Sequence, residues 1–391
     1  MQAALSHLKV LDLSRILAGP WASQTLADFG AQVIKIERPN VGDDTRSWGP
    51  PFMKDENGKE TAESAYFMAA NRGKQSVCID ITSVKGQQQI RTLAEKCDVV
   101  LENFKVGGAK KYGLDYESLS KINPRLIYCS ITGFGQTGPY KDRPGYDFLV
   151  QAMGGLMSVT GDQQSGPQKV GVALTDVMTG LYATVGILTA MAEREKSGLG
   201  QHIDLSLLDV TAATLANQAT NYLVGDKVPT GLGNAHPNIV PYQSFKTRGG
   251  HCIVAVGNES QFARLCEVIG EPDLATQEAY KTNKQRVMNR QQLIPILQKK
   301  LLEKDRDDWL TIFEKAGVPA GPINNIEEVF ENPQILARDM KVNIEHPLNK
   351  GLELPGNPIK LSRTPVQYNM PPPMLGEHTQ EVIEQFGLDL G

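Results

Sequence analysis

Leu8-Lys-Val-Leu-Asp-Leu-Ser14 and Val33-Ile-Lys-Ile-Glu-Arg38 are two strand-like segments separated by a stretch that reads as a helix. Pro20 stands where this helix can begin and Gly30 where it can end, which is the usual placing of proline and glycine at helix termini. Because parallel strands need a crossover connection, a strand, a helix and a second strand within about thirty residues predict the beginning of a parallel sheet with right-handed crossovers.

The same alternation continues along the first half of the chain. We predict strands at residues 76–80, 98–101 and 126–131, and a helix from Thr82 to about Lys96. Further helices are expected at 146–157, 176–196 and 207–223. The expected fold class is therefore α/β, with a Rossmann-like, doubly wound parallel sheet.

A change of composition divides the chain. Residues 225–241 are rich in glycine, proline and asparagine, which is typical of a loop or hinge. The segment after it alternates short strands with helices. We therefore expect a large Rossmann-like domain over 1–224, a small α+β domain over 225–330, and a return to the large domain over 331–391.

Composition and charge exclude several classes of function. A net charge of -4 over 391 residues argues against nucleic acid or a membrane surface as the main partner. No uninterrupted apolar run reaches membrane-spanning length, and a strand-like pattern begins by Leu8, which leaves little room for a targeting segment. None of the five cysteines belongs to a C-x-x-C pair, so neither a disulfide framework nor a zinc site is suggested, and we expect a cytoplasmic protein without a metal.

Asp176 is the candidate catalytic residue. It lies in Gly171-Val-Ala-Leu-Thr-Asp176-Val-Met-Thr-Gly180, between an apolar run and the start of the helix expected at 176–196. A helix N-terminus favours the ionised form of a carboxylate, so we expect a nucleophile that is ready at neutral pH. The alternative from these residues alone is that Asp176 only caps the helix, a common use of aspartate.

Basic residues gather after the predicted strands, where ligands of parallel sheets bind. These residues are either contacts for an anion with several phosphates or ordinary solvated charges: Arg38, Arg46, Arg72, Lys74, Lys110 and Lys111. Asn103 and Phe104 also follow a strand and offer an amide and a ring to a flat heterocycle, although Phe104 is equally consistent with core packing.

Two further residues are candidates because of their context. His236 ends the glycine-containing loop Gly231-Leu-Gly-Asn-Ala-His236, where a lid or a substrate contact is at home, although a lone loop histidine often has no such role. Trp48 follows Asp43-Asp-Thr-Arg46 in an expected loop and is a candidate wall of a pocket.

With these motifs in view, the chain resembles the family III (CaiB/BaiF-type) CoA transferases over essentially its whole length. The landmarks that carry the resemblance occur in the family's order: Ala18-Gly-Pro20, Gly30-Ala-Gln-Val-Ile-Lys-Ile-Glu-Arg38, Gly42-Asp43, Glu102-Asn-Phe104, Gly133-Phe-Gly135 and Leu375-Gly-Glu-His-Thr379. Within the family the chain is most similar to the branch that moves CoA from succinyl-CoA to glutarate and related dicarboxylates. That narrower match rests on segments such as Val240-Pro-Tyr-Gln243, Lys281-Thr-Asn283 and Gly321-Pro-Ile-Asn-Asn325.

The resemblance implies a role for each matching residue. Asp176 would form a covalent aspartyl-CoA thioester, reached through an anhydride. Our own hypothesis, beyond the resemblance, is that His236 and Arg46 hold the distal carboxylate of a dicarboxylic acyl group, with Trp48 as a wall of the substrate pocket. The positions that would contact CoA are Leu17, Ala18, Arg38, Ile79, Asn103, Phe104, Lys111, Tyr112, Tyr146 and Asp147. The resemblance further implies an interlocked homodimer, with acyl-CoA and a carboxylic acid as substrates.

At two positions the sequence differs from related enzymes that have other activities. Formyl-CoA transferases carry a glutamine where this chain has Leu17, which argues against formyl transfer. The alternative enzyme is an isomerase of the α-methylacyl-CoA racemase type, which needs a histidine where this chain has Tyr146. A phenol with a pKa near 10 is a poor proton shuttle at neutral pH. A CoA-binding protein without activity is a third reading, against which the presence of Asp176 argues.

Overall fold

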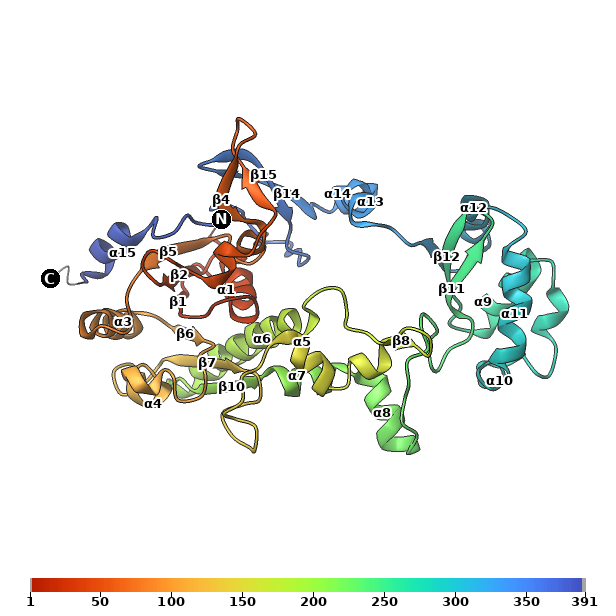
Figure 1. Ribbon diagram of the computed structural model, residues 1–391, viewed down its shortest axis with the longest axis horizontal. Helices are drawn as coiled ribbons and strands as arrows, with labels where there is room; N and C mark the ends of the chain where they lie inside the picture. The colour runs from red at the N-terminus through yellow and green to blue at the C-terminus, as the bar shows by residue number, and fades with distance from the viewer. Residues whose placement is uncertain (1, 389–391) are drawn as a thin grey trace. The chain divides into compact units, whose positions relative to one another are not determined.

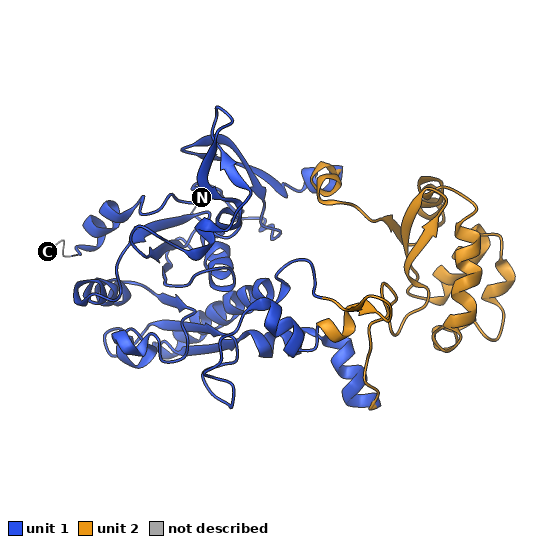
Figure 2. Cartoon of the chain, in the orientation of Figure 1, with its two compact units in different colours: residues 1–156, 169–225, 333–391 blue, residues 157–168, 226–332 orange. Residues whose placement is uncertain are grey.

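The computed structural model describes residues 2–388. The chain divides into two compact units: the first consists of Met1–Leu156, Lys169–Gly225 and Pro333–Gly391, and the second of Met157–Gln168 and Asp226–Asn332 (Figure 2). The segment 157–168, which the sequence assigned to the large domain, belongs to the second unit because its short hairpin meets the glycine-containing loop there. The backbone N–H of Gly233 donates to the carbonyl of Gly161 at 2.8 Å.

The first unit is built on a parallel sheet (Figure 1). Its strands are β1 (Lys9–Asp12), β2 (Gln32–Glu37), β5 (Lys74–Cys78), β6 (Val99–Glu102), β7 (Ile127–Thr132) and β10 (His202–Ser206). They lie in the order β10-β7-β6-β1-β2-β5, and every pairing between them is parallel. The order reverses between β1 and β6, as in doubly wound sheets, which confirms the predicted fold class.

Both faces of this sheet are covered by helices, which explains why the central strands β1 and β6 are mostly apolar and buried. Successive residues of β1 point to opposite faces: Val10 packs with α1 (Ala18–Asp28) and α6 (Leu174–Ser197), whereas Leu11 packs with α3 (Val84–Lys96) and α15 (Thr379–Phe386). The buried residues Val10 and Leu11 have no exposed surface. The carboxyl ends of the strands are thereby fixed on a rigid frame.

The helix α6 is the one described helix that is long and apolar enough to cross a membrane by length and composition. In the structure Ala183, Ile187 and Ala190 of this helix lie in the core beneath the sheet. A core helix of this kind passes the same test of composition, so we assign α6 to the packing of the first unit.

Several elements of the first unit differ from the sequence prediction. The helix expected over 207–223 is two helices, α7 (Leu207–Thr214) and α8 (Ala216–Gly225), separated where Ala216 takes a positive φ of 46°. The edge strand β10 was not predicted. Near the C-terminus, β14 (Lys341–His346) pairs with β15 (Asn349–Pro355), and residues 358–361 form no strand. The remaining elements of this unit are β3 (Phe52–Lys54), β4 (Glu60–Ser64), α2 (Ala65–Met68), α4 (Tyr116–Leu119), α5 (Asp147–Met153) and α14 (Pro333–Ala337).

The second unit is a small α+β structure. Its antiparallel sheet consists of β11 (Tyr242–Thr247), β12 (Gly250–Ala255) and β13 (Ala320–Pro322). The core beside this sheet is built on large aromatic side chains such as Phe245, Trp309 and Phe313. Its other elements are β8 (Gly161–Asp162), β9 (Gly166–Pro167), α9 (Glu259–Val268), α10 (Asn283–Met288), α11 (Arg290–Leu301), α12 (Arg306–Ala316) and α13 (Ile326–Glu331).

Candidate active site

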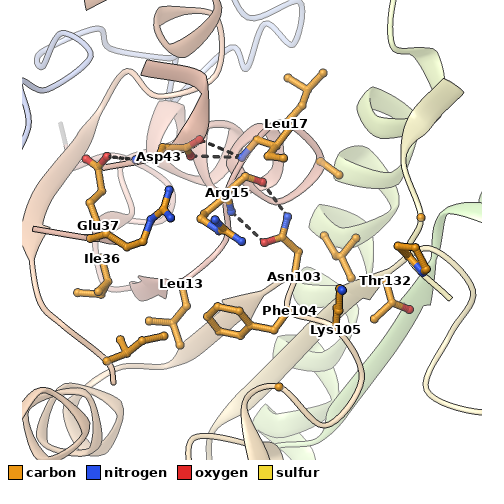
Figure 3. Close-up of a pocket in the computed structure, with 18 of the residues that line it drawn as sticks. Leu13, Arg15, Leu17, Ile36, Glu37, Asp43, Asn103, Phe104, Lys105 and Thr132 are labelled. Atoms are coloured by element: carbon orange, nitrogen blue, oxygen red, sulfur yellow. Dashed lines mark hydrogen bonds between the residues drawn. The ribbon is translucent and has the colours of Figure 1, made fainter. Parts of the chain in front are cut away.

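A cavity of about 800 Å³ lies in the first unit, beyond the carboxyl ends of β1, β2, β5, β6 and β7 (Figure 3). This is the edge of a doubly wound sheet at which ligands bind, next to the point where the strand order reverses. Among the residues given a role by the sequence, these line the cavity: Leu17, Ala18, Arg38, Ile79, Asn103, Phe104, Lys111, Tyr112, Tyr146 and Asp176. The fold therefore brings together residues that are up to 159 positions apart (176 − 17).

Asp176 lies in the first turn of α6, but it is not the cap of this helix. The residue before the helix is Ala173, which makes no side-chain hydrogen bond to the helix backbone. Burial, and then the negative charge of Asp147, raise the pKa of Asp176 from 3.8 to about 7. The helix terminus was expected to favour the ionised form of this carboxylate, but burial and a second carboxylate oppose that effect and outweigh it.

Asp147, the first residue of α5, caps α6 from outside. One oxygen of its carboxylate accepts the backbone N–H of Thr175 at 2.9 Å and that of Asp176 at 3.2 Å. The other oxygen accepts Nε2 of Gln151 at 2.7 Å. These bonds satisfy two of the four N–H groups that a helix start leaves without a partner, and they fix the backbone that carries Asp176.

Cationic side chains surround the mouth of the cavity. The guanidinium of Arg38, half exposed, donates to Asp44 at 2.7 Å, and Nζ of Lys111 lies 5.3 Å from the centre of the Tyr112 ring. Five further basic residues line the cavity and were not singled out from the sequence: Arg15, Lys35, Lys105, Lys141 and Arg143. Arg15 was within reach of that reasoning, because it follows β1 closely, as Arg38 directly follows β2. The arrangement suits a ligand that carries several phosphates.

The side chain of Asn103 forms two hydrogen bonds with the backbone of Arg15. Its side-chain oxygen accepts the N–H of Arg15 at 2.9 Å, and its Nδ2 donates to the carbonyl of the same residue at 2.7 Å (Figure 3). The expected contact between this amide and a heterocycle stays a prediction. Phe104, next in the chain, lines the cavity and is half-buried, so its ring is available to a flat group.

Buried charges lie under the cavity. Nζ of Lys35 donates to Asp43 at 2.9 Å, and Nζ of Lys74 donates to Asp12 at 3.3 Å, with all four side chains fully buried. Burial opposes ionisation of Asp43, but Lys35 and hydrogen bonds from Thr45 lower the pKa of this carboxylate to about 2. Burial lowers the pKa of Lys74 to about 7.

Three predicted substrate residues do not line the cavity. Arg46 is buried in an ion pair with Glu37 at 2.7 Å and also reaches Glu63 at 3.2 Å. Trp48 packs edge-on against the ring of Tyr66, with 5.1 Å between the ring centres. His236 belongs to the second unit, where its Nδ1 accepts the N–H of Asn238 at 3.1 Å.

The described part of the chain contains no group of three or more His, Cys, Asp or Glu side chains arranged to hold a metal. The side chains that line the cavity include one carboxylate with a pKa near neutrality, Asp176, and several basic residues. This combination suits attack on an acyl group carried by an anionic ligand.

Comparison with known proteins gives the family. Residues 5–379 match the model of CoA-transferase family III. The chain is 50% identical to a succinate–glutarate CoA-transferase of Agrobacterium fabrum, over 97% of this chain and 95% of the relative, and 44% identical to a human succinyl-CoA:glutarate CoA-transferase, over 97% and 85%. The crystal structure of a CAIB/BAIF family protein from Brucella suis is 48% identical and superposes with a TM-score of 0.87 over 99% of this chain and 100% of that one. The chain thus belongs to CoA-transferase family III and is a CoA-transferase, as its sequence predicted.

Proposed function

We propose that this enzyme transfers CoA from succinyl-CoA to a dicarboxylic acid such as glutarate, with Asp176 as the covalent carrier. The observation that carries the proposal is the place of Asp176, a carboxylate with a pKa of about 7, in the wall of a cavity with Arg38 and Lys111. The names of the two relatives above support the choice of donor and acceptor. Neither name favours the racemase-type alternative.

The first half of the reaction forms a covalent intermediate. A carboxylate oxygen of Asp176 attacks the carbonyl carbon of the donor, the C–S bond breaks, and CoA leaves as the thiolate with an aspartyl anhydride behind it. The thiolate then attacks the carbonyl carbon of Asp176. The C–O bond of the anhydride breaks, succinate leaves, and Asp176 carries CoA as a thioester.

The second half reverses these steps with the acceptor. The acceptor carboxylate attacks the aspartyl thioester, releases the thiolate, and forms a second anhydride, from which the thiolate takes the new acyl group. No step requires a net proton transfer. A carboxylate with a pKa of about 7 is still about half ionised at neutral pH and is more basic than a free aspartate, which suits reversible attack on a thioester.

The cavity supplies anchors for CoA. We assign contacts with its phosphates to Arg38 and Lys111, and the surroundings of its adenosine to Ile79, Asn103, Phe104 and Tyr112. Leu17, Ala18, Tyr146 and Asp147 would lie by the thioester. Binding energy from this distant part of the substrate holds the thioester carbonyl against Asp176 and raises the effective concentration of the two groups.

The proposal includes a homodimer, as expected from the resemblance. It is supported by large apolar side chains that stay exposed on the first unit. They lie on α5, α6 and α8 and are Phe148, Leu149, Tyr182, Val185, Leu188, Tyr222 and Leu223. Light scattering in solution checks the oligomeric state, with twice the chain mass of 42.8 kDa expected. We further propose that the two subunits of the homodimer are interlocked and that loop 231–236 closes over the active site as a lid.

The cytoplasmic location is also part of the proposal. The structure describes all five cysteines as free thiols, and four of them are buried. Free buried thiols are ordinary in a reducing compartment.

Mass spectrometry of the products tests the function. The enzyme is incubated with succinyl-CoA and glutarate, and we expect glutaryl-CoA and succinate to form in equal amounts. Asp176→Ala should abolish both products while the protein stays folded. A panel of other dicarboxylates ranks the acceptors. If solvent deuterium enters the α-carbon of an acyl-CoA with no acceptor present, and no CoA is transferred, the enzyme is an isomerase and the proposal is wrong.

A further inference from the structure

We propose that Asp43 and Asn103 are positioning residues that hold Arg15 and Ile16 in a strained turn, and so fix the start of α1 beside Asp176. The inference rests on the proposed function, because it concerns the cavity wall to which Leu17 and Ala18 belong. Neither Asp43 nor the amide of Asn103 needs to touch substrate for this role.

The strain is at Ile16. Its φ is 74°, in the left-handed region that residues with a side chain rarely adopt. For a β-branched residue such a φ is a true outlier, because the branched side chain crowds the backbone. The preference of an L-residue for the right-handed region corresponds to a population ratio of about tenfold. A turn of this shape persists only where the surrounding structure holds it.

Asp43 provides one hold. Both oxygens of its carboxylate lie 3.2 Å from the backbone N of Ile16, which donates to them. The carboxylate is itself fixed by the N–H of Thr45 at 3.0 Å and by Nζ of Lys35 at 2.9 Å. The same Nζ donates to the carbonyl of Ser14 at 3.0 Å. The buried pair of Lys35 and Asp43 therefore forms hydrogen bonds with the backbone on both sides of Arg15, at Ser14 and at Ile16.

Asn103 provides the second hold, from the end of β6. Its amide pairs with the N–H and the carbonyl of Arg15, as a neighbouring strand would. Figure 3 shows Asp43 and Asn103 approaching the turn from opposite sides. A residue from the segment after β2 and a residue directly after β6 thus fix the backbone of two consecutive residues, as a strained conformation requires.

The turn leads directly into the helix that faces Asp176. The helix α1 begins at Ala18 with no side-chain cap. The carbonyl of Ala18 lies so near Gly180 that a Cβ at that glycine would come within 2.7 Å of it. Gly180 is one helical turn after Asp176 and therefore on the same side of α6. Holding the turn thus sets the distance between the 17–18 segment and Asp176.

A double-mutant cycle tests the inference. Asp43→Ala releases Ile16, and we expect kcat/KM for CoA transfer to fall by about 10²-fold, because a small misplacement at a reacting centre has this effect. Ile16→Gly permits a positive φ without strain. Ile16→Gly changes kcat/KM by some factor in the wild type and by another factor in Asp43→Ala. We expect the second factor to be about tenfold larger than the first, in the direction of higher activity. Asn103→Ala should show coupling of the same sign with Ile16→Gly.

The matched control is Asp44→Ala. Asp44 binds the side chains of Arg15 and Arg38, whereas the backbone N–H of Ile16 donates to Asp43. Its loss should lower activity without coupling to Ile16→Gly. Melting temperatures separate positioning from general stability. The rescue should restore kcat/KM but not the melting temperature of Asp43→Ala, since Lys35 stays buried without its partner.

The cycle is also measured on the dissociation constant of CoA by calorimetry, which needs no turnover. Coupling in either quantity supports the inference, and its absence from both overturns it. A protein that shows coupling in CoA binding but transfers no CoA would contradict the proposed function and leave the positioning role standing. If Asp43→Ala does not fold, Asp43→Ala with Lys35→Met removes both buried charges, and the cycle is run in that background.

Discussion

The carboxylate of Asp147 accepts the backbone N–H of Asp176 at 3.2 Å and at the same time raises the pKa of the Asp176 carboxyl. One residue thus fixes the position of the proposed nucleophile and opposes its ionisation. The resting enzyme therefore holds Asp176 near the midpoint of its titration at neutral pH. Binding of a ligand between fixed cations is then able to alter its ionisation state.

The pH profile tests the electrostatic part of this relationship. Asp147→Asn keeps an oxygen that accepts the N–H groups of α6 but removes the negative charge, so the pKa of Asp176 should fall. Since kcat/KM reports the free enzyme, we expect its acidic limb near pH 7 in the wild type and at lower pH in the variant. Glu193→Gln, at the exposed far end of the same helix, is the control and should leave the limb in place. An unmoved limb in Asp147→Asn would show that Asp147 has no such influence.

Asp176→Asn should stabilise the protein at alkaline pH. The pKa of Asp176 is higher in the folded state, about 7, than its ordinary value of 3.8, so the folded protein binds more protons between these values. The contribution of protonated Asp176 to the free energy of unfolding is therefore complete below pH 3.8 and is lost as pH rises through 7. Ionised Asp176 then costs on the order of 2–4 kcal/mol. We expect Asp176→Asn to melt about 2–6 °C above the wild type at pH 8 and close to it at pH 5. Equal differences at both pH values would contradict the assignment.

Arg46→Met should act on stability. Glu37 is almost fully buried and would lose the guanidinium that donates to both of its oxygens. Breaking a buried pair in this way costs about 3–5 kcal/mol, and Glu37→Gln in the same chain should recover part of it. Arg248→Met, which breaks the exposed pair with Asp305, is the matched control and should change little. A stable Arg46→Met protein with a raised KM for the dicarboxylate would return Arg46 to the substrate site.

His236→Ala tests the substrate role proposed for the second unit. Burial, and then the charge of Arg290, lower the pKa of His236, so this imidazole is neutral at pH 7 and would act as a hydrogen-bond partner. Loss of such a bond to a carboxylate should raise the KM for glutarate by about tenfold and leave that for a monocarboxylic acceptor unchanged. The exposed His251 provides the control substitution. An unchanged KM for dicarboxylates would end this role for His236.

The sequence predicted the frame of the protein because the frame follows from local patterns. The central strands are buried on both faces and read as apolar runs, and Pro20 and Gly30 mark the ends of a helix. The edge strand His202–Ser206 was missed because it is only five residues long and has two apolar residues, Ile203 and Leu205, too few to establish a strand pattern. The break at Ala216 has no glycine or proline to announce it.

The electrostatics of the site were beyond sequence reasoning. The start of the helix at Asp176 was placed within two residues, but its pKa depends on Asp147, which lies 29 positions earlier and arrives through the packing of α5. Arg38 and Arg46 look alike in the sequence, since both follow the second strand. Only the fold shows that Arg46 faces the buried Glu37 while Arg38 borders the cavity. Long-range pairing of charges decides both cases.

The covalent carrier is tested most directly by trapping it. The enzyme is incubated with succinyl-CoA, quenched with hydroxylamine or borohydride, digested, and the modified residue is mapped by mass spectrometry. We predict a single modified site at Asp176, which depends on succinyl-CoA and disappears in Asp176→Ala. An adduct at another residue, or one that persists in Asp176→Ala, would contradict the claim that Asp176 carries CoA.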